Sequence, residues 1–341
     1  MYDYVIATHI PAFYKVNLYN ELAKKLNILV IFIASNTVEK RADDFVTLEN
    51  AHFDYRLLHE GDFQHRDIKK NIIELRNLTS DIEFKKLLVG GWDLMEFWYL
   101  IFTNNKTKNC LALESTINES AVGGAKGFIK RLFLNRISTV FASGKLHTEL
   151  LDALKFMGEV RITQGVGIIN KPEFEVIGRQ YQKRFLYIGR LSQEKNIALL
   201  VHIFNKLPTE YRLNIVGTGP LEDELRAIAN PNIRFIGQVE NKNLKEYFLS
   251  NDIFILPSQS ETWGLVVEEA MYFGMPVMVS RSCGSSELVI DGVNGFIFDA
   301  NCDKDISGCI LNLDCDKYLE MCKEVRLLSI VEKDHMQVDA Y

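Results

Sequence analysis

Residues 184–207 read RFLYIGRLSQEKNIALLVHIFNKL and contain the pattern that decides the fold. Arg184–Gly189 is a short, mostly apolar run of the kind that forms a buried strand. A polar turn follows, and Ile197–Leu207 has the apolar spacing of a helix. A buried strand that leads directly into a helix is the repeating unit of α/β folds with parallel sheets.

The same unit recurs from one end of the chain to the other. The other predicted strands are Tyr4–His9, Ile28–Ser35, Lys86–Gly91, Asn109–Glu114, Thr139–Ser143, Arg212–Val216, Ile233–Ile236, Asp252–Leu256 and Pro276–Ser280. The other predicted helices are Asn17–Leu26, Ile68–Leu78, Leu94–Phe102, Lys126–Arg136, Leu146–Phe156, Leu221–Ala229, Asn243–Leu249, Gly264–Phe273 and Ser285–Ile290. Continuous apolar strands between helices indicate parallel sheets covered on both faces. The predicted fold class is therefore α/β, with two Rossmann-like doubly wound domains that face one another across a cleft.

A domain boundary is expected near residues 168–178, where the strong patterns lapse and Pro172 and Gly178 interrupt the chain. The predicted domains are residues 1–168 and residues 169–324, and segment 325–341 is a candidate to pack back on the first domain. Residues 1–170 contain 21 of the 39 basic residues and 20 of the 45 acidic residues. The remainder of the chain contains 18 basic and 25 acidic residues. The first half therefore has a net charge of +1 and the second half a net charge of −7.

Composition and charge exclude several classes of protein. A chain with 47% hydrophobic residues can bury enough surface to fold, which excludes a disordered scaffold. The net charge of −6 argues against nucleic acid as a partner. No apolar stretch approaches the roughly 18–20 residues that span a bilayer, and the first residues lack the basic region of a secretory signal. We expect a cytoplasmic protein.

The cysteines do not predict a metal site. None of the six forms a Cys-x-x-Cys pair. The four in the last forty residues, Cys302, Cys309, Cys315 and Cys322, are spaced too widely for a familiar zinc motif. No bound metal and no cofactor are expected.

Two turns that contain glycine follow predicted strands. After Gly189, Arg190 offers a two-pronged donor for phosphate and Lys195 adds a second positive charge. The segment Gly217-Thr218-Gly219-Pro220 follows the next strand, and its glycines allow backbone amides to approach a base or a phosphate. Both turns lie at the carboxyl ends of strands, where open α/β sheets bind ligands. The alternative for each is an ordinary surface turn.

A third element, residues 257–271, reads PSQSETWGLVVEEAM. A strand ends at Leu256 and a helix is expected to start near Trp263, so the free amides of its first turn favour negative charge in front of them. Glu261 precedes this helix and Glu269 lies two turns into it, where carboxylates can accept hydrogen bonds from sugar hydroxyls. The alternative for Glu261 is a helix-start carboxylate. Glu269 lies in an apolar run, and burying it would require a partner.

In this order and at these strand–helix junctions, the three elements resemble the retaining family 4 glycosyltransferases of GT-B architecture, the glycosyl transferases group 1. In that family a Gly-Arg-Leu…Glu-Lys-Asn/Gly stretch grips the donor diphosphate, and a Glu-x7-Glu motif holds the donor sugar and the ribose. The resemblance assigns Arg190, Lys195 and Glu261 as catalytic residues. It assigns donor binding to Gly189, Gly217, Gly219, Thr262, Trp263, Gly264, Leu265 and Glu269. The resemblance is specific over residues 185–298 and loose in the first half.

The sequence also departs from the family pattern. The loop Cys283-Gly284-Ser285-Ser286-Glu287 lacks the paired glycines that often precede this glutamate, and Trp263 replaces the commoner phenylalanine. In the first domain, the glycine-rich loop after the first strand and the histidine after a middle strand are absent from the comparable segments.

The resemblance implies a retaining, metal-independent transfer of a sugar from a nucleotide-diphospho-sugar, with UDP as the first expectation and GDP as the second. The acceptor would be a glycan or lipid-linked saccharide, in the biosynthesis of a cell-surface polysaccharide such as capsule or lipopolysaccharide. The nucleotide-sugar is a substrate, and no protein nucleophile is evident. Two alternatives stay open, namely a non-catalytic nucleotide-sugar-binding partner subunit and a GT-B nucleotide-sugar epimerase.

Four first-domain residues are candidates for the acceptor side. Lys15 is a candidate for binding a phosphate or an acidic acceptor, and its alternative is a solvated surface lysine. His9 ends a predicted strand, and a structural histidine is the alternative. Glu114 is either an acceptor ligand or a helix cap. Trp92 is either a sugar-stacking face or a packing residue.

One predicted helix concerns a membrane partner. Lys126, Lys130, Arg131 and Arg136 interleave with apolar residues such as Phe128 and Leu132. A basic amphipathic helix of this kind can lie on an anionic membrane surface. The alternative is a helix that packs one face on its domain and exposes the other to solvent.

Overall fold

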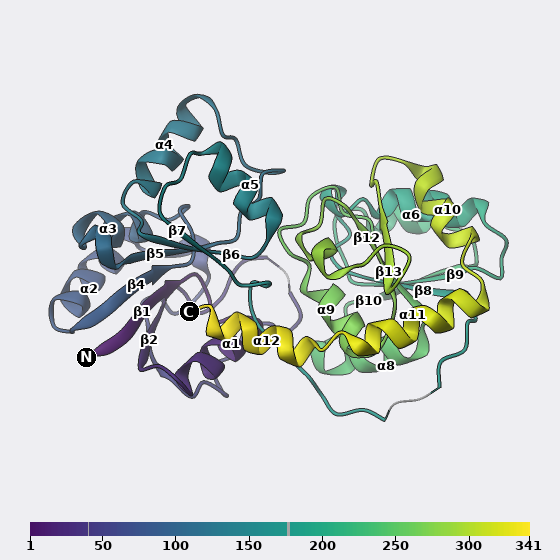
Figure 1. The fold of residues 1–341 in the computed structure, drawn as a ribbon, viewed down its shortest axis with the longest axis horizontal. Helices are drawn as coiled ribbons and strands as arrows, with labels where there is room; N and C mark the ends of the chain where they lie inside the picture. The colour runs from purple at the N-terminus through teal and green to yellow at the C-terminus, as the bar shows by residue number, and fades with distance from the viewer. Residues whose placement is uncertain (40, 176–177) are drawn as a thin grey trace. The chain divides into compact units, whose positions relative to one another are not determined.

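The computed structural model describes residues 1–39, 41–175 and 178–341. The chain divides into two compact units, Met1–Ile168 with Lys333–Tyr341, and Ile169–Glu332 (Figure 1). The segment that returns to the first unit therefore begins at Lys333, because the preceding Ile330 packs in the core of the second unit. The boundary region expected at residues 168–178 includes residues 176 and 177, which lie outside the described residues.

The first unit contains a parallel sheet with the strand order β3-β2-β1-β4-β5-β6-β7. Its strands are β1 (Tyr2–Thr8), β2 (Ile28–Phe32), β3 (Asp54–Leu57), β4 (Phe84–Val89), β5 (Asn109–Leu113), β6 (Thr139–Ala142) and β7 (Glu159–Ile162). Its helices are α1 (Phe13–Ala23), α2 (Ile68–Ser80), α3 (Met95–Thr103), α4 (Gly124–Leu134), α5 (Lys145–Ala153) and the end of α12 (Ile330–Asp339), with short 3₁₀ helices η1 (Phe63–His65) and η2 (Lys106–Lys108).

The second unit contains a parallel sheet with the order β10-β9-β8-β11-β12-β13. Its strands are β8 (Arg184–Ile188), β9 (Arg212–Val216), β10 (Ile233–Gly237), β11 (Ile253–Leu256), β12 (Val277–Ser280) and β13 (Gly295–Phe298). Its helices are α6 (Ile197–Lys206), α7 (Glu222–Ile228), α8 (Leu244–Ser250), α9 (Leu265–Tyr272), α10 (Asp303–Leu311) and α11 (Cys315–Leu327), with 3₁₀ helices η3 (Gln193–Lys195), η4 (Asn241–Asn243) and η5 (Gly284–Leu288).

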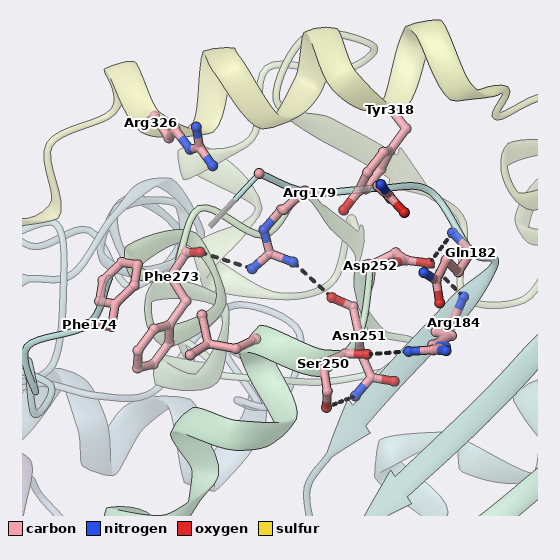
Figure 2. Close-up of a pocket in the computed structure, with 13 residues that line it drawn as sticks. Phe174, Arg179, Gln182, Arg184, Ser250, Asn251, Asp252, Phe273, Tyr318 and Arg326 are labelled. Carbon is pink, nitrogen blue, oxygen red and sulfur yellow. Dashed lines mark hydrogen bonds between the residues drawn. The ribbon is translucent and has the colours of Figure 1, made fainter. Parts of the chain in front are cut away.

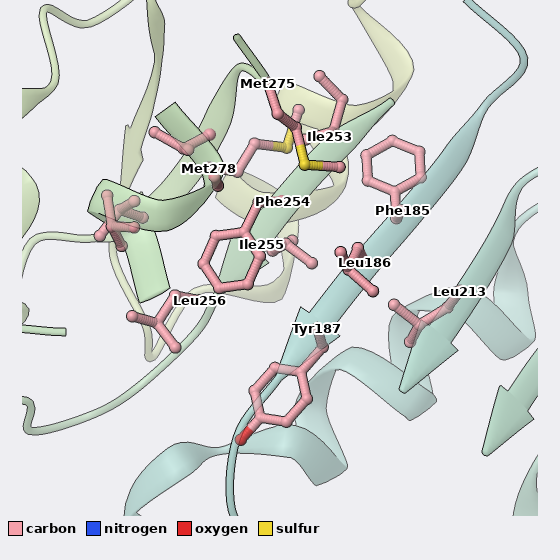
Figure 3. Packing of buried hydrophobic residues seen from close by; sticks show 14 of the residues in the cluster. Phe185, Leu186, Tyr187, Leu213, Ile253, Phe254, Ile255, Leu256, Met275 and Met278 are labelled. Atoms are coloured by element: carbon pink, nitrogen blue, oxygen red, sulfur yellow. The ribbon is translucent and has the colours of Figure 1, made fainter. Parts of the chain in front are cut away.

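Burial on both faces explains why the central strands are apolar throughout. In β1, Val5 and Ala7 pack with residues of α2–α5, whereas Tyr4 and Ile6 pack on the other face with residues of α1 and α12. Successive side chains of a strand point to opposite faces, so both faces of β1 are covered. In the second unit, Figure 3 shows buried side chains of β8 and β11 that belong to one hydrophobic core.

Several elements depart from the prediction, among them the helices α10, α11 and α12, which were not predicted. The strands β3 and β7 were not predicted, because they are edge strands with mostly exposed, polar side chains and no apolar run. The helix predicted at Ser285–Ile290 is wrong, since only the 3₁₀ helix η5 forms there. The side chain of Asn294 ends it by accepting from the Ile290 N–H (2.8 Å) and donating to the Leu288 carbonyl (3.0 Å). The strand β13 was likewise not predicted.

Candidate active site

The three predicted donor elements lie at one edge of the second sheet. They form the loops after β8, β9 and β11, and a fourth loop follows β12. All the strands are parallel, so these loops lie at the same edge of the sheet. Three backbone hydrogen bonds join them: Leu191 N–H to Thr218 O (2.9 Å), Gln259 N–H to Glu194 O (2.9 Å), and Gly284 N–H to Glu261 O (3.1 Å). Segments far apart in the sequence thus form one connected set of loops.

Gly217 and Gly219 allow the loop after β9 to pack against the loop after β8. A Cβ atom on Gly217, which has φ +124°, would lie 2.0 Å from the carbonyl oxygen of Gly189. A Cβ atom on Gly219 would lie 2.5 Å from the carbonyl oxygen of Leu191. Both contacts are with backbone, which cannot rotate away. The structure therefore supplies a packing reason for these glycines that is independent of a ligand.

Lys195 and Glu261 form an ion pair in the structure. Their side chains are 22% and 16% exposed, so solvent still reaches the pair. Arg190 is exposed, and its guanidinium forms no hydrogen bond or ion pair with any residue that the structure describes; only its backbone carbonyl accepts, from the Tyr187 hydroxyl (2.9 Å). The structure thus pairs Lys195, one predicted phosphate-binding residue, with Glu261, the predicted sugar-binding residue. The guanidinium of Arg190, the other predicted phosphate-binding group, has no partner among the described residues.

Glu194 lies between the predicted cations Arg190 and Lys195 in the sequence. The hydroxyl of Ser192 donates to its carboxylate. Burial opposes ionisation, but this hydrogen bond and the charges of Lys195 and Arg190 hold the pKa of Glu194 below its ordinary value. The loop therefore contains one further carboxylate beside its two cations.

The helix α9 begins at Leu265, directly after Gly264, whose backbone has φ +93°. Trp263 is 1% exposed, and its Nε1–H donates to the carboxylate of Glu268. The indole is therefore a core side chain, and only the backbone of Trp263 remains for a donor. The buried glutamate of this helix is Glu268, whereas Glu269 is only half-buried.

Ser285 is a residue of this region that sequence reasoning missed as a functional group. Its side chain is fully buried, and its hydroxyl makes no hydrogen bond within the described residues. A Cβ on Gly264 would lie 3.1 Å from this hydroxyl oxygen, so Ser285 lies next to the start of α9.

In the first unit, His9, Lys15 and Glu114 line a single cavity of about 320 Å³. Lys15 belongs to α1, whereas His9 and Glu114 follow the carboxyl ends of β1 and β5. Lys15 is 7% exposed and forms an ion pair with Glu114. Burial opposes the charge of Lys15, but the Glu114 carboxylate raises the pKa of Lys15 above its ordinary value. The alternative of a solvated surface lysine is therefore wrong.

His9 also pairs with a residue that the sequence did not single out. Its Nε2 lies 2.9 Å from Oδ2 of Asp93. Burial opposes ionisation of Asp93, but the hydrogen bond with His9 holds its pKa below the ordinary value. Trp92, next in sequence, does not line the cavity, and the ammonium of Lys130 lies 5.2 Å from its ring.

Two further polar residues of the first unit lack partners. His147 and Thr116 are fully buried. Neither the ring nitrogens of His147 nor the hydroxyl of Thr116 form a hydrogen bond within residues 1–39, 41–175 and 178–341. Burial lowers the pKa of His147 from 6.5 to about 4, so this histidine is neutral in the folded protein near pH 7. The burial of His147 could not be predicted, because a single histidine in a predicted helix does not indicate that its side chain is buried.

The helix α4 exposes apolar rather than basic side chains. Phe128, Ile129 and Leu132 are 62%, 50% and 43% exposed. Three of the four basic residues of the predicted membrane helix form hydrogen bonds with backbone carbonyls of the protein. Lys130 donates to Ala121 O, Arg131 to Val122 O and Arg136 to Asn104 O. Lys126 is the exposed one.

The described residues contain neither a membrane-spanning helix nor a cluster of metal ligands. No helix among them is both long enough and apolar enough to cross a membrane. No group of three or more histidine, cysteine, aspartate or glutamate side chains there is placed to hold a metal ion.

A model of the glycosyl transferases group 1 family matches residues 171–324. Residues 171–324 belong to this family. The group 1 segment comprises nearly all of the second unit and contains Arg190, Lys195, Glu261 and Glu269.

Two curated relatives are similar to part or most of the chain. Sulfoquinovosyl transferase SQD2 of Arabidopsis thaliana is 35% identical over 133 residues, which is 38% of this chain and 25% of that protein. An uncharacterized glycosyltransferase of Haemophilus influenzae is 27% identical over 277 residues, 75% of this chain and 74% of that protein. The chain thus spans about a quarter of the length of the plant relative.

The structure of HepE from Anabaena in complex with UDP has a TM-score of 0.72 to this chain at 14% sequence identity. The match covers 98% of this chain and 97% of HepE. The α/β fold of GT-B type, predicted from the sequence, is confirmed.

Proposed function

We propose that this chain is a retaining, family 4 glycosyltransferase that moves a sugar from a nucleotide-diphospho-sugar to a glycan or lipid-linked saccharide. The observation that carries the proposal is the gathering of Arg190, Lys195 and Glu261 on joined loops at one sheet edge. The group 1 match over these residues supports a transferase. The UDP in the similar HepE structure supports UDP as the donor nucleotide, with GDP as the second candidate.

The donor binds along the carboxyl edge of the second sheet. Arg190 and Lys195 hold the diphosphate, and Glu269 accepts hydrogen bonds from the ribose. The base lies beside Gly217–Gly219, with Gly189 beneath the diphosphate, and the sugar reaches Glu261. Thr262, Trp263, Gly264 and Leu265 contribute backbone groups, which is the only role that the buried indole of Trp263 leaves.

Catalysis in this arrangement is mainly electrostatic. Departure of the nucleotide diphosphate develops negative charge, which the guanidinium of Arg190 and the ammonium of Lys195 stabilise more strongly in the transition state. Lys195 must exchange Glu261 for a phosphate oxygen, and the released carboxylate then accepts from the sugar. These two fixed cations neutralise the diphosphate without a metal ion.

The test is a thermal-shift series with UDP, GDP, ADP, CMP and their common sugar conjugates, with and without chelator. Stabilisation by one nucleotide family, unchanged by chelator, is expected. Arg190→Ala should abolish that shift and lower sugar transfer by about 100-fold or more, as loss of a transition-state contact does. Arg226→Ala is the matched control, because Arg226 pairs with Glu222 in α7. No shift with any nucleotide at millimolar concentration would contradict the proposal.

The acceptor binds to the first unit at the cavity of His9, Lys15 and Glu114, with Trp92 as a further candidate contact. The ion pair of Lys15 with Glu114 and the contact of His9 with Asp93 support this, because they place polar groups with fixed partners around one concave site. Such preorganised groups suit the hydroxyls of a saccharide. The product would belong to a cell-surface polysaccharide such as capsule or lipopolysaccharide.

The first unit also binds the cytoplasmic membrane surface peripherally through α4. The exposed Phe128, Ile129 and Leu132 would insert among lipid headgroups, with Lys126 beside them and Lys130, Arg131 and Arg136 adding positive charge behind them. Co-sedimentation with vesicles of phosphatidylcholine and phosphatidylglycerol tests this. Phe128→Ser with Ile129→Ser should abolish binding, whereas Ile73→Ser, at another exposed position, should not. Binding that survives the double change would contradict this assignment.

A further inference from the structure

Three arginines lie on neighbouring strands at the edge of the second sheet opposite the donor loops. Arg184 and Arg212 begin β8 and β9, and Arg234 is near the start of β10. In the register of the sheet, Arg184 pairs with Arg212 and Arg234 pairs with Asn214. Paired residues of parallel strands, and residues two apart on one strand, share a face. The three arginines therefore project from the same face of the sheet.

These arginines line a cavity of about 620 Å³, together with polar side chains that include Thr209, Asn232 and Ser250. No carboxylate is among the described residues that line it. The volume lies within the roughly 300–1,000 Å³ of small-molecule sites. The cavity is thus concave and polar, and it carries three positive charges.

Two of the three arginine side chains of this cavity have no partner among the described residues, and the third, Arg184, lies near the carboxylate of Asp252. The side chains of Arg212 and Arg234 are exposed and form no hydrogen bond or ion pair with any other described residue. Arg184 donates to the Ser250 carbonyl at 3.4 Å, as Figure 2 shows in the adjoining cavity. By contrast, Arg179 in that adjoining cavity donates to three backbone carbonyls, of Phe248, Asn251 and Phe273. Unpaired arginines are thus concentrated here, in the half of the chain with a net charge of −7.

A buried acceptor at the same cavity also lacks a partner. Asn232 is 8% exposed, and its amide nitrogen donates to the carbonyls of Phe204 (3.0 Å) and Tyr211 (2.9 Å). These two bonds anchor the side chain, but its Oδ1 atom has no hydrogen-bond partner among the described residues. A buried acceptor without a partner costs about 1–3 kcal/mol, so a ligand donor that displaces the atoms covering Oδ1 would recover that energy.

We propose that this cavity binds a small molecule that carries two or more phosphate groups and at least one hydroxyl. The guanidinium groups bind the phosphates, since their planar forks match phosphate oxygens. Strands lie about 4.8 Å apart, so neighbouring arginines can hold phosphates that are a few ångströms apart. The hydroxyl donates to Asn232. The site is distinct from the proposed donor site, because β8 separates the two edges by five residues, about 15 Å.

The test is isothermal titration calorimetry of the full chain with inorganic tripolyphosphate, compared among four proteins. Arg212→Gln with Arg234→Gln should weaken binding by at least about tenfold, since two charged hydrogen-bonding groups are lost. Lys195→Met, which removes tripolyphosphate binding to the proposed donor clamp, and Arg226→Gln, an arginine outside the cavity, should both leave unchanged the binding that depends on Arg212 and Arg234. The side chains of Arg212 and Arg234 form no hydrogen bond or ion pair among the described residues, so the double variant should keep its melting temperature.

Two results would overturn the proposal: no binding at millimolar tripolyphosphate, or binding that Lys195→Met abolishes and the double arginine variant keeps. Titrations with a hexose bisphosphate and with a nucleoside triphosphate then show which of these two classes of ligand the cavity binds. At least one should bind more tightly than tripolyphosphate, because its hydroxyls can donate to Asn232. If neither does, the assignment of Asn232 is wrong. The outcome of this test does not depend on whether the chain transfers a sugar from a nucleotide-sugar.

Discussion

The ammonium of Lys195 and the carboxylate of Glu261, 66 positions apart in sequence, form an ion pair that joins the loops after β8 and β11. Each has a proposed partner in the donor, the diphosphate for Lys195 and the sugar for Glu261. The pair holds both side chains at the site before the donor arrives. Donor binding must replace this ion pair with two contacts, one from Lys195 to the diphosphate and one from Glu261 to the sugar. Each contact can be tested by substituting the residue that makes it.

Lys195→Ala should weaken donor binding more than Glu261→Gln does. The first change removes a phosphate contact and also leaves an unpaired carboxylate that repels the diphosphate. Adding Glu261→Gln to Lys195→Ala should therefore restore part of the lost affinity, by several-fold. Calorimetric titration with the donor identified by thermal shift measures all three variants. A double variant that binds no better than Lys195→Ala would contradict this repulsion.

The adjacent glutamates of α9 should behave in opposite ways. Glu268 is fully buried and accepts from the indole of Trp263, so Glu268→Leu should reduce the free energy of unfolding by about 1–3 kcal/mol. Glu269 is half-buried, and Glu269→Gln should leave stability nearly unchanged but weaken donor binding. Denaturant unfolding and donor titration of each variant measure the two effects. Equal loss of stability in both would show that Glu269 is structural.

Stability should fall as the pH falls from about 6.5 to about 4, through His147. Burial lowers the pKa of His147 to about 4 in the folded state, whereas the unfolded chain has the ordinary 6.5. Between these values the unfolded state binds more protons, so acid favours unfolding, by up to about 3 kcal/mol. His147→Leu should flatten this part of the pH profile of the free energy of unfolding. His52→Leu, at an exposed position of the same unit, should not.

A methyl group at Gly219 should disturb the donor loops. Its Cβ would lie 2.5 Å from the backbone oxygen of Leu191, so the loop after β9 must shift. We expect Gly219→Ala to lower the free energy of unfolding by about 1–3 kcal/mol and to weaken donor binding. Gly308→Ala is the matched control: no atom lies within 4 Å of its Cβ position in α10, so it should stabilise by about 0.5–1 kcal/mol. Normal stability and binding in Gly219→Ala would contradict the packing role.

Much of the fold was predictable from the chain because it depends on local pattern. The central strands are apolar along their whole length, which follows from burial on both faces and is visible in the sequence. The edge strands β3 and β7 bury little and therefore carry no such pattern. The end of η5 depends on the side chain of Asn294, a contact that no periodicity encodes.

The sequence by itself determined the α/β fold and the elements that carry the donor residues, because strand–helix order and short motifs are local properties of the chain. Only the tertiary structure decided which side chains meet. It paired Lys195 with Glu261 and buried Lys15 against Glu114. It buried Glu268 rather than Glu269, and it placed three arginines, two of them with unpaired side chains, around one cavity. Such contacts depend on the register of distant strands and on which face of a helix is covered, and both are set by packing of the whole unit.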